Sequence, residues 1–398
     1  MGPIAGIKVI EFAHIMAGPV CGLMLADMGA DVIKVEKLPG GDDTRRSVPP
    51  EIEGESAAFL MMNRNKRGIA VDLKTEGGRE VALKLIGSAD VVTENYRKGT
   101  MDRLGIGYEV ARELNPGVIY AELSGFGRTG PYADRAGFDL IAQSMSGLMS
   151  VTGEGPGRAP MKCGVPLTDI TAGILAAMGV LGAYVHRLKT GEGQRLDTSL
   201  FEAGIIHTYW QSAIAFATGV SPGPMGSAHP LNAPYQAFAT ADGWITIGAA
   251  NQANWLKLLD ALEAPELVDD SRFVSNDLRM AHLDELEATL ATIFATRDSA
   301  DWLERLERSG VPAGPVLDIA AMHDDPQTVA REMVPDVQHS KIGSTQTLGH
   351  PVKYSRTPAE IDRGAPCYGE HTVEVLEEFG FGAGEIEALL RDKAVYAP

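Results

Sequence analysis

Cysteine is scarce in this chain, and its three cysteines, Cys21, Cys163 and Cys367, lie far apart in the sequence. Three widely spaced thiols form neither a disulfide framework nor a cysteine-rich zinc site. They are typical of a reducing compartment, so we expect the protein to be cytoplasmic. The N-terminus has no basic segment followed by a long apolar run, and no secretory signal is expected.

Long hydrophobic runs and an excess of positive charge are also missing. No window reaches the roughly 18 uninterrupted apolar residues of a membrane helix, and the Gly- and Ala-rich stretch 170–185 is interpreted as a buried helix. With 35 Lys and Arg against 53 Asp and Glu, the formal charge is −18. Such a chain repels nucleic acid and anionic membranes, so neither is an expected partner.

The basic residues that are present gather near the N-terminus. Residues 1–103 hold 14 Lys and Arg against 15 Asp and Glu, so nearly all of the net charge lies further along the chain. Basic clusters occur at 45–46, 64–67 and 97–98. Two interpretations remain open: a solvated surface of mixed charge, or a binding site for a small polyanion.

The first half of the chain alternates short apolar runs with helical patterns. This alternation predicts an α/β fold with a doubly wound parallel sheet, covered by helices on both faces. Ligands of such sheets bind beyond the carboxyl ends of the strands, where loops 13–19, 36–46, 94–99 and 124–132 are expected. The expected strands are 8–13, 31–36, 68–73, 89–95 and 117–123, and the expected helices are 18–28, 76–87 and 102–114.

The second half predicts a smaller α+β domain between two parts of the large one. A helix over 170–188 should end before Gly191, and residues 219–234, rich in Pro and Gly, are the expected linker. The predicted division is 1–218 for the first part of the large domain, 219–320 for the small domain and 321–398 for a returning segment. Strands at 235–240 and 244–250, helices near 253–262 and 284–295, and one amphipathic helix over 371–392 are expected.

The segment GFGRTG at 125–130 matches the dinucleotide pattern G-x-G-x-x-G. That pattern requires a helix to follow at once, whereas Pro131 to Arg135 indicate a loop. We interpret it as a glycine-rich turn that lets two backbones approach closely. The nucleophile elbow, the phosphate-binding loop and metal-ligand spacing of histidines are absent, so metal-free chemistry is expected.

Asp169 stands at the start of a helix that is rich in Gly and Ala. Two roles are open for its carboxylate: an N-cap of the helix, or a nucleophile. Because a helix N-terminus stabilises an anion, the side chain is expected to stay ionised at pH 7.

Several segments together resemble the class III (CaiB/BaiF) coenzyme A transferases. The stretches that carry the resemblance are VIEFAHIMAGPVCGLMLADMGADVIKVEKLPGGDDTR, NRNKRGIAVDLKT, ENYRKGTMDRLG, SGFGRTGPYADRAGFD, GVPLTDITAGILAA, TGEGQRLDTSLFEA, GVPAGPV and GEHT, over residues 9–372. The resemblance implies an interlocked homodimer whose large domain is built from both chain ends. It also implies acyl-CoA and small carboxylates as substrates, with no permanently bound cofactor.

The resemblance carries residue roles as well. Asp169 takes the place of the catalytic aspartate, which forms an aspartyl anhydride and then an aspartyl-CoA thioester. The positions that correspond to the CoA-contacting segments are His14, Met16, Ala17, Lys37, Val71, Asp72, Leu73, Lys74, Asn95, Tyr96, Arg97, Arg103, Ala136, Gly137, Phe138 and Asp139.

Two departures from the formyl-CoA enzymes of this family narrow the range of expected substrates. Met16 stands where the formyl-CoA enzymes carry glutamine, and residues 226–235 lack their run of glycines. The chain looks more like the branch that acts on dicarboxylates such as glutarate, mesaconate or citramalate, with succinyl-CoA as donor. Phe138 replaces the histidine of the α-methylacyl-CoA racemases, which favours a transferase over that isomerase. An oxidoreductase and a non-catalytic CoA-binding protein remain as other classes.

Overall fold

The computed structural model describes residues 1–398, which fold into two compact units. The larger unit comprises 1–148, 163–208 and 326–398, and the smaller one comprises 149–162 and 209–325. The predicted bounds of the small domain, 219 and 320, lie ten residues after its observed start at 209 and five residues before its observed end at 325. The segment 149–162 and helix α10 (Tyr209–Thr218), which buries none of its own residues, belong to the smaller unit.

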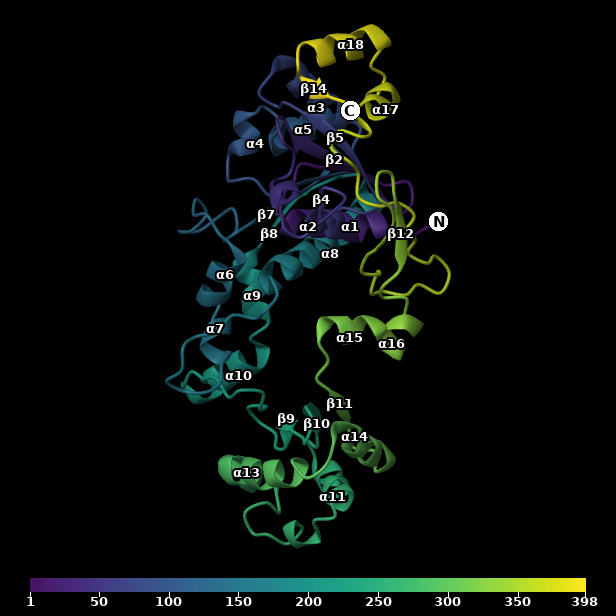
Figure 1. The fold of residues 1–398 in the computed structure, drawn as a ribbon. Helices are drawn as coiled ribbons and strands as arrows, with labels where there is room; N and C mark the ends of the chain where they lie inside the picture. The colour runs from purple at the N-terminus through teal and green to yellow at the C-terminus, as the bar shows by residue number, and fades with distance from the viewer. The chain divides into compact units, whose positions relative to one another are not determined.

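A seven-stranded sheet forms the centre of the larger unit, in the order β14-β5-β2-β1-β6-β7-β8 (Figure 1). All strands are parallel except β14, which pairs antiparallel with β5. This confirms the large parallel sheet that the alternating pattern predicts. The strands are β1 (Lys8–Glu11), β2 (Asp31–Lys37), β5 (Lys66–Val71), β6 (Val91–Glu94), β7 (Ile119–Ser124), β8 (Arg195–Ser199) and β14 (Val395–Tyr396).

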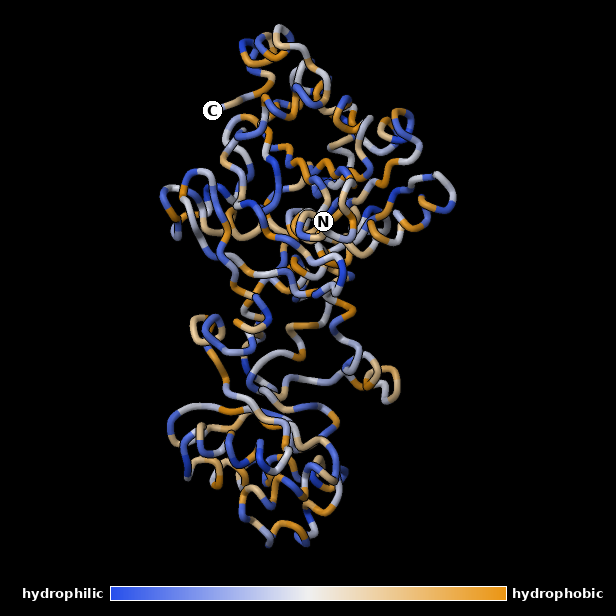
Figure 2. The backbone as a smooth tube through the Cα atoms, turned by 90° about the vertical axis from the view of Figure 1, so that its right-hand side faces the viewer, coloured by the Kyte–Doolittle hydropathy of each residue, from blue (hydrophilic) through white to orange (hydrophobic).

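Helices cover both faces of this sheet because successive strand residues point to opposite sides. Val9 belongs to the apolar core on one face, and its neighbour Ile10 belongs to the core on the other. Figure 2 shows hydrophobic stretches running through the interior of this unit. The first face carries α1 (Ala17–Asp27), α6 (Asp139–Met145), α8 (Leu167–Thr190) and α9 (Leu200–Ile206); the second carries α3 (Glu76–Gly87), α4 (Thr100–Arg103), α5 (Tyr108–Leu114), α17 (Thr372–Glu378) and α18 (Ala383–Arg391).

Two predicted helices are each divided into two in the structure. The helix expected over 102–114 is split into α4 and α5, with Gly105 at φ 73° between them. The tail expected as one helix over 371–392 is split into α17 and α18, with Gly380 at φ 77°. Glycine adopts this left-handed conformation without a steric penalty, so it ends one helix and redirects the chain.

Helix α8 is long and apolar enough to cross a membrane by length and composition, a test that core helices also pass. Its buried face consists of small residues such as Ala172, Gly173 and Ala176, which allow close packing against α1. Gly191 ends the helix in the left-handed conformation, which confirms the predicted stop.

The smaller unit is built on a three-stranded antiparallel sheet, β11-β10-β9, with a core around Trp255, Phe294 and Trp302. Its strands are β9 (Tyr235–Ala239), β10 (Trp244–Gly248) and β11 (Ala313–Pro315). Besides α10, its helices are α11 (Gln252–Ala261), η2 (Pro265–Leu267), α12 (Asn276–Ala281), α13 (Leu283–Phe294), α14 (Ser299–Arg308) and α15 (Ile319–Asp324), and α7 (Leu148–Val151) lies at the division.

Several short elements complete the larger unit. They are η1 (Asp43–Arg46), β3 (Glu51–Ile52), β4 (Glu55–Ser56), α2 (Ala57–Met62), α16 (Pro326–Ala330), β12 (Asp336–His339) and β13 (Gly343–Gln346). Of these, η1 follows β2 and lies in one of the loops predicted to border a ligand site.

Candidate active site

A pocket of about 390 Å³ lies within the larger unit, at the carboxyl ends of the parallel strands. The loops after β1, β6 and β7 line it, together with the first turn of α8. Strands β1 and β6 are neighbours, while β2, the next strand after β1 in sequence, lies on the other side of β1. The pocket therefore lies where the strand order reverses, the usual ligand position in doubly wound sheets.

Asp169 lines this pocket as the third residue of α8, and it does not cap the helix. The N-cap position is occupied by Pro166, which has no side chain able to accept a hydrogen bond. Asp139 serves the helix terminus instead, because its Oδ1 accepts from the backbone N–H of Thr168 at 2.9 Å and from the Thr168 hydroxyl at 2.8 Å. The N-cap interpretation of Asp169 is therefore wrong, and its carboxyl is left available to the pocket.

The expectation that Asp169 stays fully ionised at pH 7 is also wrong. Burial raises the pKa of its carboxyl, and the negative charge of Asp139 raises it further, to about 7. Burial in a pocket wall removes solvation from the anion, which favours the neutral carboxyl. Close to neutral pH, the unliganded protein holds Asp169 as a mixture of carboxyl and carboxylate.

The GFGRTG segment forms a glycine-rich loop and does not begin a helix, as predicted, and its Gly125 and Arg128 line the pocket. A Cβ added to Gly125 would lie 2.6 Å from the Cα of Gly137, so the two backbones touch. The buried Arg128 forms ion pairs with Glu94 and Glu122, and its Nη1 donates to the Tyr96 carbonyl at 2.9 Å. These contacts join the loop after β6 to the loop after β7.

Many of the residues proposed from the resemblance meet in this pocket. The pocket also includes residues that the resemblance did not indicate, most of them within the predicted loops 94–99 and 124–132 or directly beside them. Leu200, directly after β8, stands in the stretch TGEGQRLDTSLFEA that carries the resemblance, but no role was assigned to it from the sequence. The proposed residues are His14, Met16, Ala17, Asn95, Tyr96, Arg97, Ala136, Gly137, Phe138 and Asp169; the additional ones are Ile15, Lys98, Thr100, Leu123, Ser124, Gly125, Arg128, Ala133, Asp134, Arg135 and Leu200.

The remaining proposed residues lie outside the pocket lining. Lys37 forms an ion pair with Asp43 at 2.7 Å, and Arg103 donates to the hydroxyl of Thr100 at 2.9 Å. Asp139 acts on the terminus of α8, as described above. Val71 is the last residue of β5, two strands away from β1, and Asp72, Leu73 and Lys74 follow it.

Three cations on the pocket lining, Arg97, Lys98 and Arg135, are exposed to solvent and have no carboxylate within ion-pair distance. Arg135 lies over the ring of Tyr132, 4.0 Å from its centroid. In a chain with a formal charge of −18, unpaired cations at one pocket form a local site for an anion.

The profile of CoA-transferase family III matches residues 4–372. The chain belongs to this family. The family III chain is 41% identical to the succinate–glutarate CoA-transferase of Agrobacterium fabrum over 94% of its own length and 95% of that protein. It is 39% identical to the succinyl-CoA:mesaconate CoA-transferase of Haloarcula hispanica, over 96% and 98% of the two chains.

A solved structure agrees with this assignment. The crystal structure of a CaiB/BaiF family protein from Brucella suis matches with a TM-score of 0.85 and 40% identity, over 95% of this chain and 99% of that chain. The fold and the sequence therefore lead to the same family, and the protein is a CoA-transferase.

Proposed function

We propose that this CoA-transferase moves CoA from succinyl-CoA to a dicarboxylic acid, with Asp169 as the nucleophile. The observation that carries the proposal is the position of Asp169 in the pocket, at the start of α8 and not used as a cap. The names of the relatives, which act on glutarate and mesaconate with succinyl-CoA or succinate, support the substrate class.

In the first half-reaction, an oxygen of the Asp169 carboxylate attacks the thioester carbonyl of succinyl-CoA. The C–S bond breaks, which gives a mixed anhydride and the CoA thiolate. The thiolate then attacks the Cγ of Asp169, and succinate leaves with the anhydride oxygen. Asp169 now carries CoA as a thioester.

In the second half-reaction, the carboxylate of the acceptor attacks this aspartyl thioester and releases the thiolate again. The thiolate attacks the acceptor carbonyl of the new anhydride, so that acceptor-CoA forms and the Asp169 carboxylate is regenerated. CoA must remain bound while its thiol is free, which requires contacts away from the sulfur. The unpaired Arg97, Lys98 and Arg135 are suited to its phosphate groups.

We also propose that the protein acts as a homodimer, interlocked as the resemblance implies. The outer face of α8 supports this, because it exposes apolar side chains at helical spacing. Ile174, Met178, Val185 and Leu188 are between 47% and 69% exposed. A continuous apolar surface of this kind is costly in water and favours a partner, and a second copy of the chain would cover it.

The substrate proposal is tested by incubating the protein with succinyl-CoA or acetyl-CoA and a panel of mono- and dicarboxylates, with products read by mass spectrometry. We expect new acyl-CoA only with dicarboxylate acceptors and the succinyl donor. Incubation of a branched acyl-CoA in deuterated water serves as the control for racemase chemistry. Exchange of the α-proton without CoA transfer would refute the proposal.

The role of Asp169 is tested by Asp169→Asn, which removes the nucleophile while keeping the shape of the side chain. We expect a folded protein without turnover. Hydroxylamine should convert the wild-type intermediate to a hydroxamate on the peptide that contains Asp169. Turnover at a near wild-type rate in the variant, with deamidation excluded by mass, would contradict the assignment.

A further inference from the structure

The loop between β1 and α1 forms one side of the pocket in an unfavourable backbone conformation. His14, Ile15 and Met16 line the pocket that also holds Asp169. Ile15 has φ 68°, in the left-handed region. A β-branched residue is rarely found there because its side chain crowds the backbone. Such a conformation persists only where the surrounding contacts determine it, and it is commonly associated with a functional site.

Side chains from three other parts of the sheet hold the polar backbone groups of this loop. The backbone N–H of Ile15 donates to both carboxylate oxygens of Asp42, at 3.0 and 3.2 Å. The side chain of Asn95 accepts from the N–H of His14 at 2.9 Å and donates to its carbonyl at 2.7 Å. Lys34 donates to the carbonyl of Ala13 at 2.8 Å. The loop conformation is therefore imposed from outside the loop.

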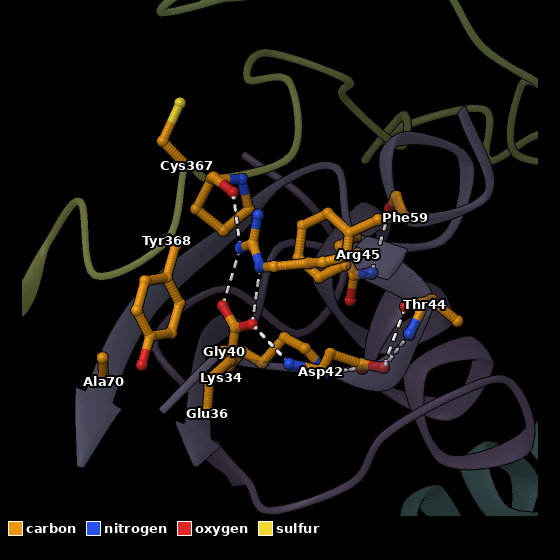
Figure 3. A network of polar contacts seen from close by, with 12 residues as sticks. Lys34, Glu36, Gly40, Asp42, Thr44, Arg45, Phe59, Ala70, Cys367 and Tyr368 are labelled. Atoms are coloured by element: carbon orange, nitrogen blue, oxygen red, sulfur yellow. Dashed lines mark hydrogen bonds and ion pairs between the residues drawn. The ribbon is translucent and has the colours of Figure 1, made fainter. Parts of the chain in front are cut away.

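The hydrogen bonds and the ion pair of the Asp42 carboxylate are all with donors, and Figure 3 shows Thr44 beside it. Its carboxylate lies 2.9 Å from the Nζ of Lys34, and both side chains are fully buried. It also accepts from the N–H of Thr44 at 3.0 Å and from the Thr44 hydroxyl at 2.8 Å. Together with the N–H of Ile15, these donors occupy both oxygens. An amide at position 42 would have to direct its NH₂ group toward another donor.

The backbone of Asp42 is fixed in turn by a second pair. Its N–H donates to Glu36 at 2.9 Å, and Glu36 also accepts from the Nε of Arg45 at 2.7 Å. Arg45 lies over the ring of Phe59, 3.6 Å from the centroid, and donates to the carbonyl of Pro366 at 2.9 Å (Figure 3). Asp42 thus has a fixed position that does not depend on the loop it holds.

We propose that Asp42 is a positioning residue of the active site, which holds Ile15 and thereby places the 14–16 segment against the acyl-CoA. Asp42 does not line the pocket with Asp169, so it acts through the loop backbone. The expected change in kcat/KM rests on the proposed function. The affinity for free CoA does not depend on turnover, so it tests the inference independently.

The test is Asp42→Asn, with Asp27→Asn as the matched control. Asp27 is likewise buried and pairs with the buried Arg64 at 2.5 Å, but neither residue lines the pocket. Both variants should unfold at a lower temperature. Only Asp42→Asn should lower kcat/KM per folded enzyme and weaken the affinity for free CoA in calorimetry, each by about tenfold, as expected for loss of a charge-assisted hydrogen bond.

A rescue variant separates positioning from stability. Glycine adopts a left-handed φ without crowding, so Ile15→Gly in the Asp42→Asn background should recover several-fold of the lost kcat/KM. If Asp42→Asn alone does not fold, the same measurements are made with Lys34→Met added, which removes both charges of the Lys34–Asp42 pair and leaves Glu11 paired with Lys66 at 2.9 Å. Because the carbonyl of Ala13 then also loses its donor, a loss of at least the same size is expected there, with the same rescue.

The inference is overturned if folded Asp42→Asn, or the Lys34→Met combination, binds CoA and turns over within twofold of wild type, as expected for Asp27→Asn. Absence of rescue by Ile15→Gly would also overturn it. Failure of the wild type to transfer CoA between any acids would instead refute the proposed function. In that case the CoA affinities of the variants would still decide the role of Asp42.

Discussion

At the scale of single residues, the environment of Asp169 matters as much as its identity. Burial is the main cause of its raised pKa, and the charge of Asp139 adds to it. A carboxyl with a pKa of about 7 is a better nucleophile, once ionised, than one that is well solvated. The same environment makes activity and stability depend on pH near neutrality.

The first prediction concerns the pH profile. In the proposed mechanism only ionised Asp169 attacks the thioester, so kcat/KM should rise with pH through about 7. Asp139→Asn should shift this rise to lower pH, because it removes a negative charge while Oδ1 can still accept from Thr168. Measurement of kcat/KM from pH 5 to 9 in both proteins tests this, and a flat profile in the wild type would contradict it.

The second prediction concerns stability. The pKa of Asp169 is raised in the folded state, from 3.8 to about 7, so the native protein binds the proton more tightly than the unfolded chain. The contribution of Asp169 to wild-type stability should therefore fall as pH rises from about 4 to 7. Asp169→Asn should be more stable than wild type at pH 8, and the difference should shrink toward pH 4. Asp260→Asn, at an exposed position of α11, is the control and should show no such pH dependence. Thermal unfolding of the wild type and both variants at several pH values tests this prediction.

At the scale of elements, the contact between α1 and α8 places the two sides of the site. Gly173 of α8 packs so closely on α1 that an added Cβ would lie 2.6 Å from the carbonyl oxygen of Ala17 and 2.7 Å from the Cβ of Val20. Ala17 and Asp169 both line the pocket. The spacing between these two helices therefore sets the width of the site.

The third prediction compares a glycine of α8 with one of α18. Gly173→Ala should destabilise the protein by about 1–3 kcal/mol and lower kcat/KM, because the helices must move apart. Gly384→Ala, at an exposed position of α18, should be neutral or stabilising, because a Cβ there meets nothing within 4 Å and alanine favours helix. Denaturant unfolding and kinetics of both variants test this. Equal effects of the two changes would argue against the role of close packing.

The sequence predicted the elements of the sheet well, because alternation of strands and helices is a local pattern. Elements that depend on distant partners were not predicted. β14 consists only of Val395 and Tyr396, and it is a strand because Val71 and Ala70 of β5 lie opposite. The sequence of β8, RLDTS, is mostly polar, and the segment forms a strand because its backbone pairs with β7.

The same distinction, between local sequence patterns and contacts with distant residues, applies to the candidate active site. Motifs and strand ends placed most of the pocket loops, but the role of Asp139 at the terminus of α8 depends on a contact 29 residues away. The buried pair of Lys34 and Asp42 could not be predicted either. Both residues stand in the stretch 9–45 that carries the resemblance, but no local pattern shows that their side chains meet. From the sequence, cations such as Lys37 were expected to be free to bind CoA, whereas the fold pairs Lys37 with Asp43.

At the scale of the whole molecule, the exposed face of α8 has the largest consequence for assembly. The fourth prediction is that the protein sediments as a dimer at nanomolar concentration. Met178→Glu, at a site 63% exposed, should shift it to monomer because a charge cannot be buried there without a partner. Leu114→Glu, on α5 over the other face of the sheet and 48% exposed, is the control and should remain dimeric. A stable, active monomer of the wild type would contradict the prediction.

The larger unit is assembled from both ends of the chain, with α17, α18 and β14 all coming after residue 371. During synthesis, every residue of the smaller unit leaves the ribosome before residue 326 does. The apolar side chains of β2 and β5 share a core with Val375, Leu376 and Ile386, so they stay uncovered until that later segment has been synthesised. The pocket that holds Asp169 therefore lies in the unit that is the last to become a finished fold, and a ribosome that stops before residue 372 releases a protein in which every pocket residue is present on an unfinished sheet.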